Sequence, residues 1–345
     1  MATTLDVAKL RLAAQKLAPN AVNATPLAIV RHMLAMQGQD LPGAKWAIGV
    51  RAPGVTIADV DAALHARAIV RSWPLRGTLH LVAAEDLKWL LALHADKTLG
   101  AVTKRRLELG LDDKTLRRIR DVAERVLAGK RLSRDALIDA WNRAKLDAEP
   151  HRAYHAIWHL AHHAVICQGP DEEFVLVDDW IAKHNTYDRD EALGELVRRY
   201  FIGHGPATLA DLARWIKLPQ RDLKIGLDLS KRSLADHAGM YMAPTLAAAK
   251  SPPCLLLPGF DELVLGYEDR TATLDKARES NIVPGGNGMF KATIVAGGRV
   301  VGTWKRKDKA KEIVVEPLLW GAAPKGLAAA ASAYGAFLGK PARIA

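Results

Sequence analysis

Amphipathic helices followed by short strands are the recurring pattern along most of the chain. In residues 209–217 (LADLARWIK), apolar positions recur at helical spacing. Leu218-Pro219 breaks that pattern, residues 221–229 (RDLKIGLDL) predict a second helix, and residues 239–244 (GMYMAP) predict a strand. Helix, short turn, helix and hairpin is the order of a winged helix-turn-helix unit.

The same start signal occurs three times. Thr56, Ser133 and Thr208 are each followed within three residues by an acid, as at a helix N-cap, and they are spaced by 77 and then 75 residues. Such regular spacing indicates a repeated unit of about domain size.

Helices and hairpins are also predicted around the first two signals. After Ser133 we expect helices over 135–145 and 151–165 and a hairpin made by 165–169 and 174–180. The segments expected around Thr56 are a helix over 26–37, another over 57–67, and two strands within 69–82 that turn at Gly77.

From residue 252 onward the pattern becomes rich in β-branched residues. Pro252-Pro253 reads as a break, and Gly297-Gly298 between two apolar runs predicts a hairpin. The loop 281–288 (NIVPGGNG) lacks the flanking strand and helix of a nucleotide-binding fingerprint. The strands expected here lie in 254–267, 289–306 and 312–317, and a helix over 326–339 closes the chain.

These patterns predict an α+β fold of tandem winged helix-turn-helix units with a β-rich C-terminal region. The boundaries expected from the composition and the start signals divide the chain into 1–100, 101–190, 191–250 and 251–345. Hydrophobic residues make up 49% of the 345 residues, enough to form a core without disulfides or metals.

Positive charge is concentrated in two segments. The formal net charge is +11, and residues 101–131 hold ten Lys and Arg against five acids. Residues 299–311 hold six Lys and Arg against one Asp. Two concentrated basic segments favour contact with nucleic-acid phosphates. The alternatives are a solvated helix face and a basic hairpin edge that discourages sheet aggregation.

Compartment and membrane topology follow from what the sequence lacks. Cys167 and Cys254 lie far apart and fit no metal-ligand spacing, so we expect free thiols in a reducing cytoplasm. The N-terminal residues show no apolar signal core, and no run of about 18 apolar residues suggests a membrane span.

Histidines spaced by four residues raise the question of a metal. His151, His155, His159 and His163 would lie along one helix face with His162 beside them. The first residue after His155 is Ala, where a zincin needs a Glu, and no acid or Cys cluster supplies further ligands. We therefore expect no metal and no other cofactor, and a helix face that packs against a neighbour or contacts phosphate.

The segment Gln37-Gly38-Gln39-Asp40 is unusual at the end of a predicted helix. Taken alone, it is explained by Gly38 as a helix C-cap with solvated amides on either side. No Gly-x-Ser-x-Gly elbow or Ser-His-Asp arrangement accompanies it, which disfavours acyl-transfer hydrolysis.

Three separated stretches resemble one family in sequence order. They are residues 37–40, residues 71–82 (RSWPLRGTLHLV) and residues 257–270 (LPGFDELVLGYEDR), supported by 282–284 and 299–306. Together they resemble the winged-helix DNA glycosylases of the AlkZ and YcaQ group, and the resemblance runs over roughly residues 10–340. Each motif alone is weak, whereas the ordered combination is fairly specific.

The resemblance implies a C-shaped, basic DNA-binding channel and excision of alkylated bases, with interstrand crosslinks unhooked by some members. The family signature Gln-x-Gln falls on Gln37 and Gln39, which become the expected catalytic pair. The middle residue is commonly apolar in the family, whereas this chain has Gly38. Asp40 is a candidate for electrostatic support of a sugar cation, or simply a surface acid.

Physical chemistry is consistent with a pair of amides. A purine alkylated at N7 is already cationic, so its glycosidic bond breaks through an oxocarbenium-like state without prior protonation. An amide is no general base, but it can orient a water by accepting one hydrogen bond and donating another. We therefore expect a monomeric DNA glycosylase acting on alkylated or crosslinked double-stranded DNA.

DNA contacts are expected from one strand and from the two basic segments. Arg76, Thr78 and His80 would share a strand face, although a half-buried imidazole explains His80 equally well. The basic segments contribute Lys104, Arg105, Arg106, Arg117, Arg118, Lys305, Arg306 and Lys307.

Two other functions are compatible with the same residues. A winged-helix regulator or architectural protein would bind DNA without chemistry, although such regulators usually dimerise and no coiled-coil segment is evident. An RNA-binding protein is the weaker alternative.

Overall fold

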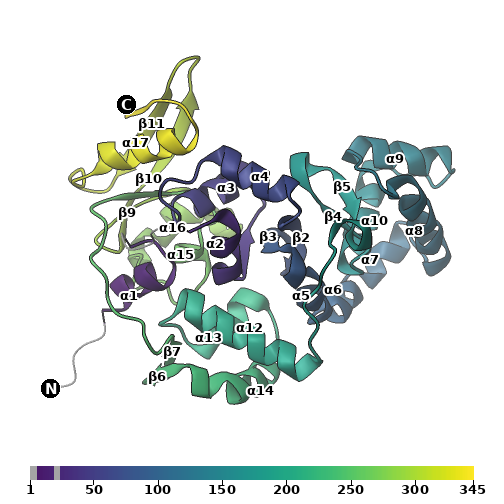
Figure 1. Ribbon diagram of the computed structural model, residues 1–345, viewed down its shortest axis with the longest axis horizontal. Helices are drawn as coiled ribbons and strands as arrows, with labels where there is room; N and C mark the ends of the chain where they lie inside the picture. The colour runs from purple at the N-terminus through teal and green to yellow at the C-terminus, as the bar shows by residue number, and fades with distance from the viewer. Residues whose placement is uncertain (1–5, 19–23) are drawn as a thin grey trace. The chain divides into compact units, whose positions relative to one another are not determined.

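The computed structural model describes residues 6–18 and 24–345 (Figure 1). By internal contacts the chain divides into two compact units. The first joins residues 1–61 to residues 193–345, and the second is the continuous segment 62–192. This division is coarser than the four segments predicted from the sequence, which stay a prediction. No described helix is long and apolar enough to cross a membrane.

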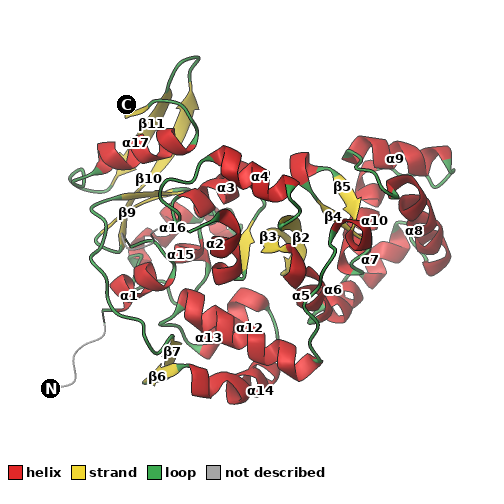
Figure 2. Cartoon of the chain, viewed as in Figure 1, coloured by secondary structure: helices red, strands yellow, loops and turns green. Residues whose placement is uncertain are grey.

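The second unit is mostly helical around a small antiparallel sheet (Figure 2). Its strands pair in the order β3-β2-β4-β5, and β2 turns into β3 at Arg76 and Gly77, both with positive φ. The elements are α4 Ile57–His65 at the boundary, β2 Ile69–Leu75, β3 Thr78–Ala83, α5 Leu87–Ala92, α6 Ala95–Ala101, α7 Thr103–Glu108, α8 Asp113–Leu127, α9 Arg134–Arg143, α10 Pro150–His162, β4 Ile166–Gln168, β5 Phe174–Leu176 and α11 Val177–Trp180.

Helices α8, α9 and α10 enclose the core of this unit. Trp141 on α9 is fully buried, and its indole Nε1 donates to the Ile119 carbonyl of α8 at 3.0 Å. Leu116, Ile119 and Leu127 recur at helical spacing and turn one face of α8 inward. The opposite face of α8 therefore carries its charged residues.

The first unit combines helices from both ends of the chain with a C-terminal sheet. Its elements are α1 Val7–Ala14, α2 Pro26–Met33, β1 Ala35–Gln37, α3 Leu41–Gly49, α12 Arg189–His204 at the boundary, α13 Leu209–Ile216, α14 Gln220–Ser230, β6 Ala235–His237, β7 Met240–Met242, β8 Leu255–Leu257, α15 Glu262–Leu265, α16 Glu279–Ile282, β9 Thr293–Ala296, β10 Arg299–Asp308, β11 Ile313–Leu319, α17 Leu327–Phe337 and β12 Ala342–Ile344.

The C-terminal sheet has five strands in the order β12-β11-β10-β9-β8. Helix α17 packs on β12 and β8, and Trp46 of α3 donates from Nε1 to the Leu256 carbonyl at 2.7 Å. Trp304 of β10 donates in the same way to Leu257 at 2.8 Å, and both indoles lie edge-on to Tyr334 of α17. This aromatic cluster joins the N-terminal helix α3 to the sheet.

All three repeated start signals are helix N-caps, as the sequence predicted. Ser133 Oγ accepts from Ala136 N at 3.2 Å, while Thr56 and Thr208 form reciprocal pairs with Asp59 and Asp211. After Thr208 the structure runs α13, a break at Pro219, α14 and the antiparallel β6–β7 hairpin, in the predicted order. The predicted hairpins at Gly77, at 166–176 and at Gly297-Gly298 are also present.

Several predicted elements were wrong in extent or type. The helix predicted over 26–37 ends at Met33, because Leu34 takes a positive φ of 66° and the chain continues as strand β1. The strand predicted within 254–267 covers only β8, and Glu262–Leu265 is helix α15, capped by Asp261. The hairpin strand predicted over 174–180 stops at Leu176, and the rest is helix α11.

A buried ion pair links three distant parts of the first unit. The Arg51 guanidinium has no exposed surface and binds both carboxylate oxygens of Asp261, at 2.7 and 2.9 Å. It also donates to Gln15 Oε1 at 2.7 Å and to the Ala47 carbonyl at 2.9 Å. Asp261 in turn accepts from Leu263 N and caps α15. Fixing Asp261 therefore places α15 against α1 and α3.

Removing one partner of this pair should be costly, because the other charge would stay buried without compensation. We expect Asp261→Ala to lower the free energy of unfolding by about 3–5 kcal/mol, measured by urea denaturation. Asp147→Ala, which removes the exposed partner of Arg152, is the control and should cause a much smaller loss. Equal losses for the two variants would contradict a structural role for the buried pair.

Candidate functional site

The backbone from Gln37 to Asp40 is not helical, which is what a pair of amides acting together requires. Gln37 is the last residue of β1, Gly38 lies outside any regular element, and Gln39 and Asp40 form a bend before α3. In a regular helix, residues two apart point about 200° from one another. The strand and bend found here remove that constraint, so the two side chains are not forced to opposite sides.

A short hydrogen bond orders the segment from within. The Gln37 side-chain oxygen Oε1 accepts from the backbone N–H of Gln39 at 2.6 Å. Gly38 between them is buried, Gln37 is half-buried and Gln39 is exposed. An amide oxygen has two lone pairs, so Gln37 can accept this bond and a second one from another donor.

The buried carboxylate of Glu262 holds the backbone of the Gln-x-Gln segment. Glu262 is 2% exposed, and its Oε1 accepts from the backbone N–H of Gln37 at 3.4 Å. Its Oε2 accepts from Trp215 Nε1 at 2.8 Å and lies 3.5 Å from His204 Nε2. The His204 ring stacks on Tyr200 with its centroid 4.7 Å away. Strand β1 is thereby attached to α12, α13 and α15 at one carboxylate.

Asp40 lies at the N-terminus of α3 and is exposed. Its carboxylate leans over the first turn, since a Cβ added at Gly43 would lie 2.5 Å from Asp40 Oδ2. A negative charge there is favoured by the partial positive charge of the helix end. Gly43 therefore makes room for a carboxylate beside the Gln-x-Gln segment.

Arg306, in the second basic segment, and Asp40 both act on the hydroxyl of Tyr334. Burial raises the pKa of the Tyr334 hydroxyl, and the charges of Asp308 and Asp40 add to that effect against the opposing influence of Arg306. Arg306 donates from Nη1 to the Tyr334 hydroxyl at 3.0 Å and pairs with Asp308. Arg306 is thus tied to the protein itself.

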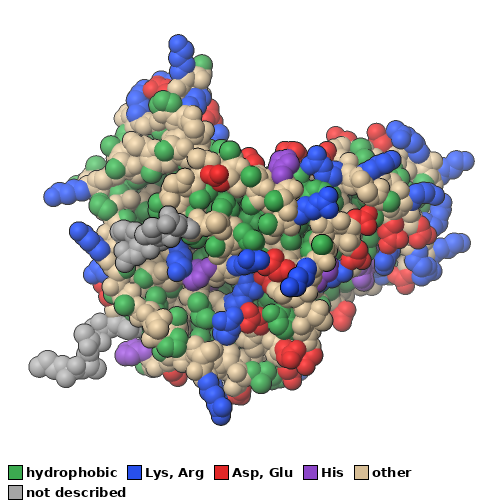
Figure 3. All heavy atoms as spheres, in the orientation of Figure 1, with side chains coloured by type: hydrophobic (Ala, Val, Ile, Leu, Met, Phe, Trp, Pro, Cys, Tyr) green, Lys and Arg blue, Asp and Glu red, His purple; other side chains and the backbone are tan. Residues whose placement is uncertain are grey.

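Lys305 and Lys307 lie on the other side of the same strand. Both are exposed on β10, where alternation separates them from Trp304 and Arg306. Lys305 is paired in register with Glu316 and Lys307 with Val314 of β11. The hairpin tip, which carries exposed lysines up to Lys311, projects from the C-terminal sheet with lysine and arginine side chains around it (Figure 3).

The strand residues predicted to contact DNA form a local network in the second unit. His80 has no exposed surface, its Nδ1 pairs with the Thr78 carbonyl at 2.8 Å, and its Nε2 lies 3.1 Å from Arg76 Nη2. Thr78 Oγ1 donates to the Leu75 carbonyl at 3.3 Å. His80 therefore supports the β2–β3 turn and does not present its ring to solvent.

The first basic segment divides between α7 and α8. Lys104 and Arg105 are exposed on α7, with Arg105 paired to Glu108, and Arg117 and Arg118 are exposed on α8. Arg106 is only 17% exposed and pairs with Asp113 at 3.0 Å. Lysine and arginine side chains are dense over the region of α8 and α9 in Figure 3.

Two features of the sequence gained a meaning only in three dimensions. Glu262 was part of a motif noted for its resemblance, but an acid in the sequence gives no sign of burial. Helix α10 carries the evenly spaced histidines, yet among the described residues no group of three or more His, Cys, Asp or Glu side chains could hold a metal ion.

Cys167 and Cys254 are both buried free thiols, and burial raises the pKa of Cys254 to about 11.

Comparison with known proteins places this arrangement in a family. The family described as DNA glycosylase AlkZ-like matches residues 30–337. An interstrand DNA cross-link repair glycosylase from Streptomyces sahachiroi is 24% identical over 317 residues, 84% of each chain. The solved structure of Streptomyces sahachiroi DNA glycosylase AlkZ aligns with a TM-score of 0.81 at 22% identity, over 99% of this chain and 98% of that one, which shows a shared fold. Because the family match spans most of the chain, the protein belongs to the AlkZ-like DNA glycosylases.

Proposed function

We propose that this glycosylase hydrolyses the N-glycosidic bond of N7-alkylated purines in double-stranded DNA, with a water positioned by Gln37 and Gln39. The observation that supports this most directly is the non-helical backbone at the pair, stiffened by the bond from Gln39 N to Gln37 Oε1. Two neutral amides that are two residues apart need a non-helical backbone of this kind in order to act on one water.

The reaction needs little acid or base catalysis. Cleavage of the C1′–N9 bond sends the bonding electron pair to the cationic purine, which leaves as a neutral base. The sugar becomes an oxocarbenium ion, water attacks C1′, and the proton of that water passes to solvent. What the protein contributes is orientation of the water and dipoles aimed at the developing charge.

Each glutamine has a distinct part in this scheme. Gln37, with one lone pair of Oε1 already used by Gln39 N, would accept a hydrogen bond from the water through the other. Gln39, which is exposed, would align the water from the substrate side. Asp40 would stabilise the sugar cation through its negative charge.

The same excision reaction would also act on crosslinked DNA. The curated relative is named for interstrand DNA cross-link repair. If each end of a crosslink is a purine alkylated at N7, excising one end by the reaction above separates the strands. We therefore propose crosslink unhooking as a second substrate class of the same site.

Base excision should depend on both glutamines. We expect Gln37→Ala and Gln39→Ala to reduce release of N7-methylguanine by about 10- to 1000-fold, the loss seen when one positioned polar group is removed. Binding to duplex DNA should change little, because the amides are neutral and phosphate contacts dominate affinity. Single-turnover assays of base release, with binding measured by fluorescence anisotropy, separate the two effects.

Gln220→Ala, an exposed glutamine at the start of α14, is the matched control and should release base at the wild-type rate. Equal rates for the wild type and the double Gln37→Ala, Gln39→Ala variant would show that the pair is not catalytic. No base release by the wild type at all would favour the regulator hypothesis.

Glu262 should act as a positioning residue for Gln37. Glu262→Gln keeps the side-chain shape but offers an NH2 group toward one of the N–H donors of Gln37 and Trp215. We expect the single-turnover excision rate to fall by about 10-fold or more while DNA affinity changes much less, and the melting temperature should fall as well because a buried N–H loses its acceptor. The control is Glu268→Gln, an exposed carboxylate nearby. A variant that loses melting temperature but keeps the wild-type rate would limit Glu262 to a structural role.

The basic hairpin should contribute to binding through Lys305 and Lys307, because Arg306 is engaged with Tyr334 and Asp308. We expect Lys305→Glu with Lys307→Glu to weaken duplex binding and to reduce the slope of log affinity against log salt by about 1 for each lost phosphate contact. Lys183→Glu with Lys325→Glu, both exposed and outside the basic segments, has the same net charge and should keep the wild-type slope. Matching slopes for the two double variants would exclude the hairpin from the interface.

A further inference from the structure

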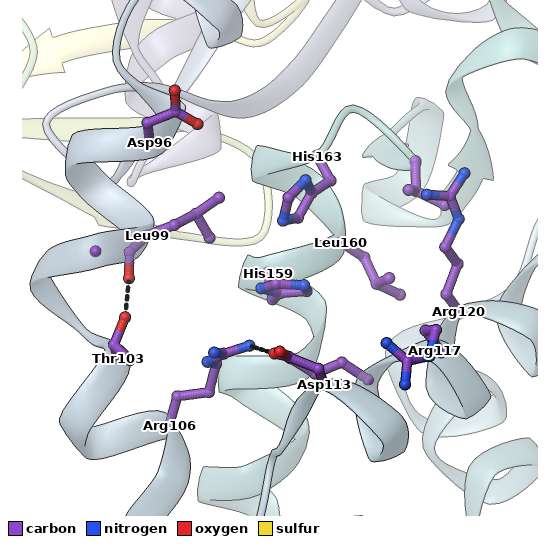
Figure 4. A pocket seen from close by; sticks show the side chains of 13 residues that line it. Asp96, Leu99, Thr103, Arg106, Asp113, Arg117, Arg120, His159, Leu160 and His163 are labelled. Atoms are coloured by element: carbon purple, nitrogen blue, oxygen red, sulfur yellow. Dashed lines mark hydrogen bonds and ion pairs between the residues drawn. The ribbon is translucent and has the colours of Figure 1, made fainter.

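A cavity of about 410 Å³ lies within the second unit, where α6, α7, α8 and α10 meet (Figure 4). Its floor is apolar and includes Leu99, Leu116, Leu160 and Val165. Its polar side chains are Thr103, Arg106, Arg117, Arg120, His159 and His163, with Asp96 and Asp113 as the acids. The basic segment and the spaced histidines noted in the sequence therefore come together at one place.

The three arginines of this cavity outnumber its two acids, and the arginines and imidazoles reach it from separate elements. Arg106 comes from α7, Arg117 and Arg120 from α8, and the two imidazoles from α10 and its end. Figure 4 shows the Arg106 guanidinium beside Asp113 and close to the His159 ring. Asp113 is 75% exposed, so it can leave Arg106 for solvent at small cost when a ligand supplies another anion.

His159 has an unused hydrogen-bonding atom here. Its Nδ1 is buried and without a hydrogen-bond partner. The His159 and His163 rings lie one turn apart on α10, with centroids 4.4 Å from each other. A buried polar atom without a partner costs free energy, which a bound phosphate would recover once the ring is protonated and both ring nitrogens donate.

We propose that this cavity binds a phosphate group, held by Arg106 and Arg117 and by the ring N–H groups of His159 and His163. Guanidinium groups match the oxygens of phosphate in charge and geometry. The volume exceeds that of a phosphate alone, and the leucines of the floor suit an apolar or aromatic group attached to it. Phosphate on the DNA backbone and phosphate on a free nucleotide share this chemistry.

Phosphate binding should be coupled to proton uptake. Burial lowers the pKa of His159 to about 4, and the charges of His163, Arg106 and His162 lower it further against the opposing effect of Asp113. Burial also lowers the pKa of His163, whose charged neighbours are Arg120, Asp96 and Arg106. A bound anion reverses this local field and raises both values, so affinity must increase as pH falls from neutral toward about 4.

The test uses dimethyl phosphate, whose single charge does not titrate in this range, and follows the histidine ring nitrogens of the full chain by NMR. We expect saturable shifts of the His159 signals, assigned by their loss in His159→Asn, and tighter binding at lower pH. Arg106→Gln with Arg117→Gln should weaken binding by about 10-fold or more. Arg134→Gln with Arg143→Gln, which removes two exposed arginines of α9 outside the cavity and outside the basic segments, should leave it unchanged.

The source of the phosphate is decided by competition. Displacement of dimethyl phosphate by a short unmodified duplex assigns the cavity to the DNA backbone, and this arm rests on the proposed function. Displacement only by a deoxynucleoside 5′-monophosphate assigns it to a free nucleotide. Absence of saturable shifts, or equal weakening by both arginine pairs, overturns the proposal. Base release by the same preparations is scored separately, so failure of the glycosylase mechanism is distinguishable.

Discussion

Two adjacent buried carboxylates, Asp261 and Glu262, organise the first unit. Asp261 neutralises Arg51 and caps α15, and Glu262 binds the backbone N–H of Gln37 and the indole of Trp215. A buried charge without compensation costs several kcal/mol, so these contacts must form together or not at all. The position of β1, and with it the position of the two glutamines, therefore depends in part on a residue more than two hundred positions away.

This arrangement constrains the segment chiefly through its main-chain N–H groups. Gln37 is held through its own N–H by Glu262 and through its side-chain oxygen by Gln39 N. Preorganisation of this kind removes the entropy cost of fixing a polar group at the moment of reaction. The glutamines can then act through geometry, which suits a leaving group that is already charged.

Local signals in the sequence predicted the features with local causes. Thr56, Ser133 and Thr208 were recognised as caps because a cap depends on its own side chain and an acid within three residues. The predicted secondary structure was wrong where partners distant in sequence determine the local conformation. The helix over 26–37 stops at Met33 because the following residues join a strand, and Glu262 is helical and buried because Arg51, Trp215 and His204 surround that segment. The Gln-x-Gln pair could be named from its resemblance, and a non-helical backbone there follows from the need for both amides to converge. The support of the pair by a buried carboxylate could not be predicted.

The discontinuity of the first unit has a consequence for synthesis on the ribosome. The segment 62–192 leaves the ribosome as one continuous piece, before the C-terminal part of the first unit has been synthesised. Arg51 must wait for Asp261, which is 210 residues further along the chain, and this takes on the order of ten to forty seconds at bacterial elongation rates. During that interval Arg51 lacks its buried counter-charge, so the first unit, which holds the candidate catalytic pair, can be completed only after residues 62–192 have been synthesised.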